Sequence, residues 1–225
     1  MEFEDGQIYH VFNRGNNSQT VFFSNENYQN FLDKMEEYIK PFASILAWCL
    51  MPNHFHILLK VENSELDWGP GNLAKNKWPG TAISTKAHRS LNKSIAIMLR
   101  LYTRYVNSED EKQGPLFHQR TKALCLSKPE FEPGYFQNHF GWLGKTPPRE
   151  KDYPSICFNF IHNNPVTGKQ VDKPEDWEFS SYRDYYSGRE GKLLDKELAK
   201  ELKLPTSDGY SNRMSSNQFS PSFLW

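Results

Sequence analysis

The hydrophobic residues of this chain follow two periods, and the order of these periods restricts the fold more than any other feature. Apolar residues alternate in a strand with one buried face, and they recur every three to four positions in an amphipathic helix. Alternating patterns or continuous apolar runs, both typical of strands, occur at residues 7–14, 42–51 and 54–61, and GPLFHQRTKALCL at 114–126 resembles a turn followed by a strand. The helical spacing occurs at residues 25–40 and 91–106.

The resulting order is strand, helix, strand, strand, helix, strand. This order is that of a ferredoxin-like α+β fold, in which helices pack on an antiparallel sheet. The short turn Met51-Pro52-Asn53 predicts a hairpin between the second and third strands. We therefore expect a ferredoxin-like α+β domain, with no internal repeat and no clear domain boundary.

Residues 62–88 interrupt this pattern and are expected to form a loop insertion. Their central stretch, WGPGNLAKNKWPGT, is rich in Gly, Pro, Asn and Trp and has no hydrophobic period. Long loops of this kind in a compact domain are more often functional or disordered than structural. A second aromatic, Pro-rich stretch covers residues 130–148, and the Ser/Asn-rich sequence after Pro205 is expected to fray.

Composition excludes several classes of protein. Lysine and arginine number 27, as do aspartate and glutamate, so any binding to nucleic acid must come from a local patch rather than from net charge. No segment approaches the length of a membrane span, and the acidic N-terminus lacks the apolar core of a signal peptide. The isolated Cys49, Cys125 and Cys157 fit a reducing compartment. We expect a cytoplasmic monomer or homodimer.

Two histidines lie one residue apart in the third predicted strand, within MPNHFHILLK. Because side chains alternate along a strand, His54 and His56 leave one face and Phe55 leaves the other. Neutral imidazole is a common metal ligand, so the pair favours a site for one divalent ion. A pair of satisfied polar side chains at a strand end is the alternative, and the strand by itself does not decide between them.

The string CFNFIHNNPV predicts a short helix from Pro154 to Asn164, because Pro165 cannot continue a helix. Phe160 and Asn164 are four residues apart and therefore share one helical face. Taken alone, Phe160 is typical of a core aromatic residue, and Asn164 of the last residue of a helix.

Basic residues stand beside aromatic residues in two further strings. FHQRTKA contains Gln119, Arg120 and Lys122, and FNRGN contains Arg14. Cations interleaved with rings suit the phosphates and bases of a single-stranded nucleic acid. A solvated strand edge has a similar composition and is the alternative.

Four strings in this order, MPNHFHILL, GPLFHQRTKA, the NPV of the last helix and WEFSSYRDYY, together resemble a known family. They resemble the single-tyrosine HUH transposases, and among them the REP-associated tyrosine transposases of bacteria. The resemblance covers about residues 7–186. It implies an HUH transposase-like domain at residues 1–187, followed by a partly flexible C-terminal tail at 188–225. It implies a metal-dependent endonuclease that nicks and rejoins single-stranded DNA at hairpin-forming repeats, through a 5′-phosphotyrosine intermediate, during DNA transposition.

The resemblance also implies roles for particular residues. His54, His56 and Asn164 would hold one Mg²⁺ or Mn²⁺ ion, which polarises the scissile phosphate. The nucleophilic tyrosine would stand one helical turn before the third ligand, where this chain has Phe160. Phenylalanine keeps the ring and lacks the nucleophilic oxygen.

We therefore expect the chain to bind metal and single-stranded or hairpin DNA without forming a phosphotyrosine at residue 160. Tyr153, two turns before Phe160, is a weaker candidate for the nucleophile, and Tyr102 and Tyr105 are expected to pack in the core. The alternative function is a catalytically silent DNA-binding protein on the same fold, acting as a repressor or a hairpin binder.

Overall fold

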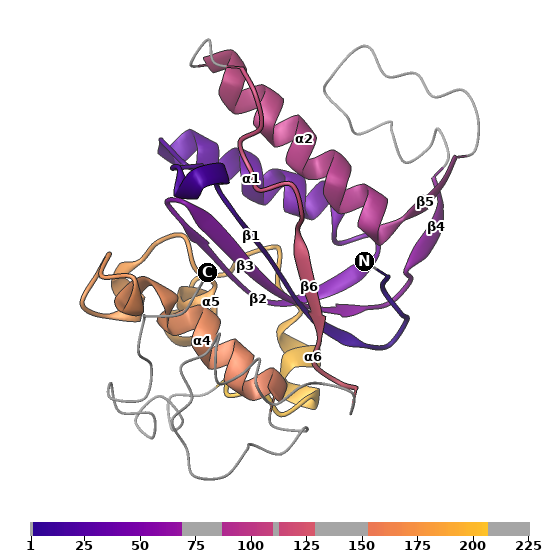
Figure 1. Ribbon diagram of the computed structural model, residues 1–225. Helices are drawn as coiled ribbons and strands as arrows, with labels where there is room; N and C mark the ends of the chain where they lie inside the picture. The colour runs from indigo at the N-terminus through magenta and orange to yellow at the C-terminus, as the bar shows by residue number, and fades with distance from the viewer. Residues whose placement is uncertain (1, 69–86, 110–112, 129–152, 207–225) are drawn as a thin grey trace.

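The fold is built on a four-stranded antiparallel sheet with strand order β2-β3-β1-β6 (Figure 1). The computed structural model describes residues 2–68, 87–109, 113–128 and 153–206. The strands of this sheet are β1 (Ile8–Arg14), β2 (Ala43–Met51), β3 (His54–Val61) and β6 (Lys122–Cys125). Element order and strand order together confirm the predicted ferredoxin-like α+β class.

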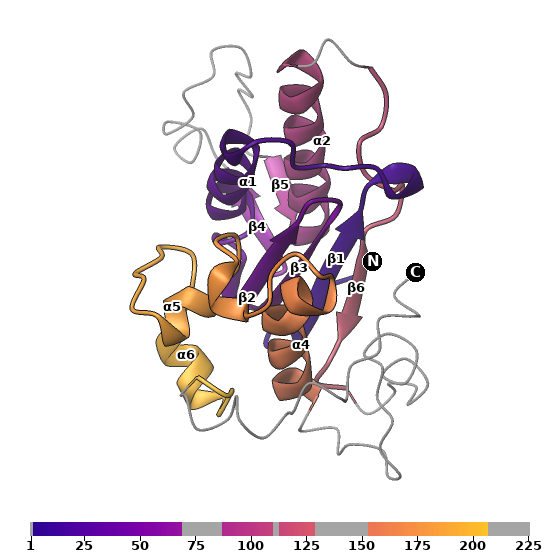
Figure 2. The same cartoon turned by 90° about the vertical axis from the view of Figure 1, so that its left-hand side faces the viewer.

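Helices cover both faces of the sheet (Figures 1 and 2). On one face lie α1 (Asn25–Tyr38) and α2 (Leu91–Glu109), and on the other lie α4 (Tyr153–Thr167), α5 (Tyr182–Tyr186) and α6 (Lys196–Glu201). Phe55, Ile57 and Leu59 of β3 pack with α1 and α2, whereas Leu58 packs with α4. Because both faces are covered, β3 reads as a nearly continuous apolar run.

Two sequence-based boundaries are wrong. The ends of the expected loop insertion are strands, since β4 (Glu65–Trp68) pairs with β5 (Ala87–Ser90) as an antiparallel ribbon. Each strand has only four residues, too few to show a hydrophobic period. Their pairing satisfies backbone hydrogen-bonding groups of both strands. Residues 69–86 lie outside the described part of the chain, as do 129–152 and 207–225, which include the second Pro-rich stretch and the end of the tail.

Helix α4 does not end at Asn164 but continues through Pro165 to Thr167. Proline removes one intrahelical hydrogen bond, and this loss is tolerable in the last turn, where few further bonds depend on it. The carbonyl of Asn164 still accepts from the amide of Gly168 at 2.7 Å, so the helix end remains satisfied. Pro165 is itself buried, and its packing favours the longer helix.

The string WEFSSYRDYY closes the outer edge of β2. Phe179 accepts a backbone hydrogen bond from Leu50 at 2.9 Å, and Ser181 donates one to Trp48 at 2.9 Å. The Trp177 indole nitrogen donates to the carbonyl of Leu50 at 3.0 Å. An exposed edge strand invites pairing with other chains, and this segment removes that exposure. The string therefore has a structural role.

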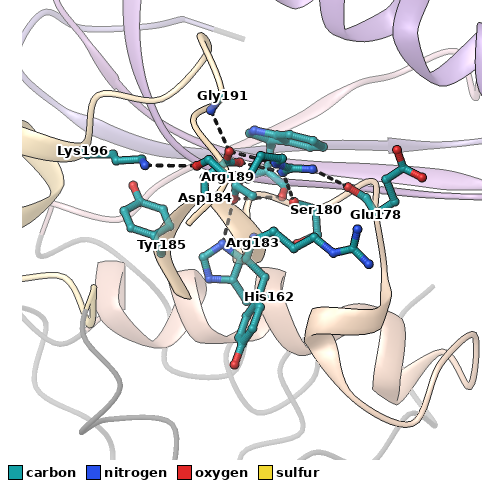
Figure 3. Close-up of polar contacts among 12 residues, drawn as sticks. His162, Glu178, Ser180, Arg183, Asp184, Tyr185, Arg189, Gly191 and Lys196 are labelled. Atoms are coloured by element: carbon teal, nitrogen blue, oxygen red, sulfur yellow. Dashed lines mark hydrogen bonds and ion pairs between the residues drawn. The ribbon is translucent and has the colours of Figure 1, made fainter. Parts of the chain in front are cut away.

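An ion pair with a buried carboxylate fixes the chain after this segment (Figure 3). Asp184, only 3% exposed, accepts from Arg189 at 2.6 and 2.9 Å and from the Gly191 amide at 2.9 Å. Arg189 also donates to the carbonyls of Glu178 and Ser180 and lies over the ring of Trp48. These contacts cross the expected boundary at residue 187 and tie the following residues to the sheet.

Among the described helices, none combines the length and the apolar character that spanning a lipid bilayer would require.

Candidate metal site and basic pocket

The two histidines of β3 and the asparagine of α4 meet on the sheet face that α4 covers. Asn164 Oδ1 lies 2.9 Å from His54 Nε2, and Asn164 Nδ2 lies 3.4 Å from His56 Nε2. The exposed fractions are 8% for His54, 1% for His56 and 2% for Asn164. The fold thus brings together the three side chains that the sequence suggested as metal ligands.

His54 has an amide oxygen beside each of its ring nitrogens. Nδ1 lies 2.6 Å from Asn53 Oδ1, and Nε2 lies 2.9 Å from Asn164 Oδ1. The neutral ring carries one proton and can donate to only one of these oxygens. With the proton on Nδ1, as a metal at Nε2 would require, Asn53 orients the ring, and metal-binding histidines are commonly oriented by such a bond at the other ring nitrogen.

His10 of β1 orients the second histidine, and the sequence analysis did not select it. Its Nε2 lies 2.9 Å from His56 Nδ1, and the two rings stack with centroids 5.0 Å apart. With the shared proton on His56 Nδ1, the Nε2 atom of His56 faces the Asn164 amide as an acceptor. Alternation along β1 places His10 and Phe12 on the same side of the strand. The pairing of Phe12 with His56 across β1 and β3 then brings His10 beside His56.

Burial keeps these imidazoles neutral. Desolvation lowers the pKa of His54 to about 4, with a smaller opposing effect from its hydrogen bond to Asn164. Desolvation also lowers the pKa of His56 well below its usual value, and the neighbouring His10 and His54 lower it further. Because metals bind the deprotonated ring, both histidines are in the ligand form at neutral pH.

Acid is expected to weaken the fold through these histidines and through His162, whose pKa burial lowers to about 3. Unfolded histidines take up protons near pH 6.5, whereas the folded protein does so only below about 4. The unfolded state therefore binds more protons between these values. The free energy of unfolding should fall with decreasing pH, by up to about 1.4 kcal/mol per pH unit for each histidine.

Urea denaturation at pH 7 and pH 5 measures this loss. His162→Gln keeps a donor to Ser181 Oγ, which accepts from His162 Nε2 at 2.7 Å, and it removes one titrating group. The variant should lose less stability between the two pH values than the parent protein. An equal loss would mean that His162 does not contribute.

The donor set fits a divalent cation. Two neutral imidazole nitrogens and one amide oxygen form a mixed set that suits Mn²⁺ and admits Mg²⁺. Within the described ranges, no group of three or more His, Cys, Asp or Glu side chains is arranged to hold a metal ion. An ion here would therefore depend on Asn164 as the third protein ligand, with water or phosphate oxygens completing its coordination.

Phe160 lies one turn before Asn164, beside the histidines. Its ring meets the ring of His56 edge to face with centroids 5.2 Å apart, and that of His10 at 6.1 Å. It is also only 5% exposed and packs among the apolar side chains under α4. The ring thus points toward the site, as expected, while being part of the core. Tyr153, two turns away at the start of α4, is buried among the same apolar side chains.

A small basic pocket, lined in part by β1, lies beside the histidines of β3. A space of about 90 Å³ is lined by Phe12, Asn13, Arg14, His118, Arg120 and Lys122. Arg14 pairs with His54 across the strands, and Phe12 pairs with both His56 and Lys122. Paired residues share a sheet face, so Arg14 and Lys122 lie on the face of the candidate metal ligands, and Arg120 lines the same pocket. Gln119 is exposed and does not line this pocket.

Comparison with known proteins gives structural similarity without a sequence match. No family model matches the chain, and no curated protein matches its sequence. Among solved structures, the chain is similar to a REP-associated tyrosine transposase bound to a REP hairpin, with 14% sequence identity and a TM-score of 0.48. The alignment covers 87% of this chain and 92% of the other. A similarity at this level does not assign a function.

Proposed function

We propose that the protein binds single-stranded or hairpin DNA at a divalent-metal site of the HUH transposase type, and that it does not cleave this DNA as it stands. The observation that carries the proposal is the convergence of three buried side chains, with the Asn164 amide 2.9 Å from His54 Nε2 and 3.4 Å from His56 Nε2. We expect DNA binding without cleavage because Phe160 has no nucleophilic atom. The form that nicks and rejoins DNA through a phosphotyrosine needs a tyrosine at this position.

The two parts of the site divide the work. Arg14, Arg120 and Lys122 would hold backbone phosphates and set the register of the strand. His54, His56 and Asn164 would hold Mg²⁺ or Mn²⁺, which when bound polarises a phosphate oxygen and neutralises its charge. Asn53 and His10 keep the two imidazoles in the tautomers that ligation requires.

Removing a proposed ligand should weaken metal binding. Calorimetric titration with Mn²⁺ should show that His54→Ala and His56→Ala each lose at least tenfold in affinity. His10→Phe keeps an aromatic ring but removes the partner of His56, and should lose about 10- to 100-fold. His88→Ala, which changes an exposed histidine on β5, is the matched control and should bind like the parent protein. A parent protein that does not bind Mn²⁺, or ligand variants that bind it normally, would contradict the site.

Removing charge from the basic pocket should weaken DNA binding at low salt. Each phosphate contact contributes about 0.7 to the slope of log affinity against log salt for single strands. Arg120→Gln and Lys122→Gln should therefore each lower the affinity and reduce the magnitude of the slope by about 0.7, the value for one phosphate contact. Fluorescence anisotropy with a labelled hairpin oligonucleotide carrying single-stranded flanks, over about 50 to 200 mM salt, measures both.

Lys93→Gln is the control for this measurement, because Lys93 is an exposed lysine on α2, on the opposite side of the sheet. It should leave both affinity and slope unchanged. If all three variants behaved alike, the phosphates would lie elsewhere on the protein.

A further inference from the structure

A second pocket opens at the candidate metal site, and its chemistry differs from that of the basic pocket. It has a volume of about 400 Å³ and shares His54 and Asn164 with the proposed ligand set. Its other lining residues come from the segment after β1, the β2–β3 turn and the end of α4: Ser18, Thr20, Met51, Pro52, Asn53, Thr167, Gly168 and Gln170.

This lining is polar but contains no Lys, Arg, Asp or Glu. Asn53 and Gln170 offer amides, Thr20 and Thr167 offer hydroxyls, and Pro52 adds an apolar surface. A phosphate would gain more from the three cations of the basic pocket. A neutral, flat group with a hydrogen-bonding edge suits the second pocket better, because amides pair with adjacent donors and acceptors on base edges. Its volume also lies within the usual range of about 300–1,000 Å³ for ligand pockets.

The walls of this pocket are tied together before any ligand binds. The amide of Gly15 donates to Asn53 O at 2.7 Å, and that of Val21 donates to Pro52 O at 2.7 Å. Between them, Asn17 and Ser18 hold positive φ angles of 53° and 59°, which non-glycine residues adopt only when the surrounding structure requires it. Because these walls are already fixed, little conformational entropy would be lost when a ligand binds.

Asn53 links the pocket to the metal site. Its side-chain oxygen accepts from His54 Nδ1, and its residue lines the pocket. A group bound in the pocket would therefore lie beside the amide that orients His54, next to a phosphate at the metal.

We infer that this pocket receives one unpaired nucleobase of the bound strand, adjacent to the phosphate at the metal site, and that Gln170 reads its edge. The inference rests on the proposed function and extends it: the basic pocket holds the backbone, and the neutral pocket supplies preference for a base. The sequence alone gave no sign of it, since its lining comes from three separate segments.

Titration of the full chain with small probes in the presence of Mg²⁺ tests the inference. The probes are the four deoxynucleoside 5′-monophosphates and deoxyribose 5-phosphate, which has the phosphate and sugar but no base. At least one nucleotide should bind ten times more tightly than deoxyribose 5-phosphate. In Gln170→Ala, and in Thr167→Phe, which fills the pocket, this ratio should fall to about threefold or less.

Gln113→Ala, an exposed glutamine outside this pocket, is the matched control and should keep the full ratio. Equal binding of nucleotides and deoxyribose 5-phosphate would overturn the inference and leave the proposed phosphate and metal site intact. A ratio that survives in both pocket variants would also overturn it. Failure of every probe, together with failure of the hairpin oligonucleotide, to bind would overturn the proposed function and this inference with it.

Discussion

Phe160→Tyr is expected to let the protein become covalently joined to single-stranded DNA, a reaction that we do not expect of the parent protein. The ring of Phe160 lies 5.2 Å from that of His56 and one turn before Asn164. A hydroxyl there could attack a phosphate at the metal site, forming a 5′-phosphotyrosine and releasing a 3′-hydroxyl on the other DNA fragment. A labelled hairpin oligonucleotide incubated with Mn²⁺ should then give a protein–DNA adduct on a denaturing gel, whereas the parent protein should give none.

Two further variants separate this result from nonspecific effects. Phe160→Tyr combined with His56→Ala should form no adduct, because the metal site is lost. Phe158→Tyr places a hydroxyl on a fully buried ring that packs against His162, and it should also form no adduct. A buried hydroxyl without a partner costs roughly 1–3 kcal/mol. If Phe160→Tyr proves both destabilised by this amount and inactive, residue 160 is part of the core only.

Asp184→Ala is expected to destabilise the protein by about 1.5–3 kcal/mol, the range for hydrogen bonds to charged groups, because the carboxylate is buried while the Arg189 side chain is 32% exposed. The Asp184 carboxylate accepts from Arg189 and from the amide of Gly191, and its side chain is 1% exposed. Without it, the Arg189 guanidinium keeps its charge beside Trp48 with its main counter-ion gone. Urea denaturation at neutral pH measures the change in the free energy of unfolding.

The exposed pair Lys200–Glu197 provides the control, since such pairs contribute only about 0–1 kcal/mol. Glu197→Ala should therefore change stability little. In the double variant Asp184→Ala/Arg189→Ala no charge remains unpaired, so its loss should be smaller than the sum of the single losses. A loss below about 1 kcal/mol in Asp184→Ala would show that the pair does not hold this segment to the sheet.

The local geometry of this protein could be predicted from its sequence. The two hydrophobic periods located the four strands of the sheet and the helices α1 and α2, because each period follows directly from backbone geometry. The same reasoning placed His54 and His56 on one strand face and Phe160 and Asn164 on one helix face. Failures came where the pattern was too short, as in β4 and β5, or where packing overrode a local rule, as at Pro165.

The tertiary structure decided which of these faces meet. The pairing of β1 with β3 put His10 against His56 and Arg14 opposite His54, and the docking of α4 brought Asn164 to the histidines. The fold also leaves Gln119 outside the lining of the basic pocket. Strand register and helix docking depend on the packing of residues far apart in the sequence, and no local period records them. The sequence could therefore name the candidate ligands, but only the fold could show that their side chains converge.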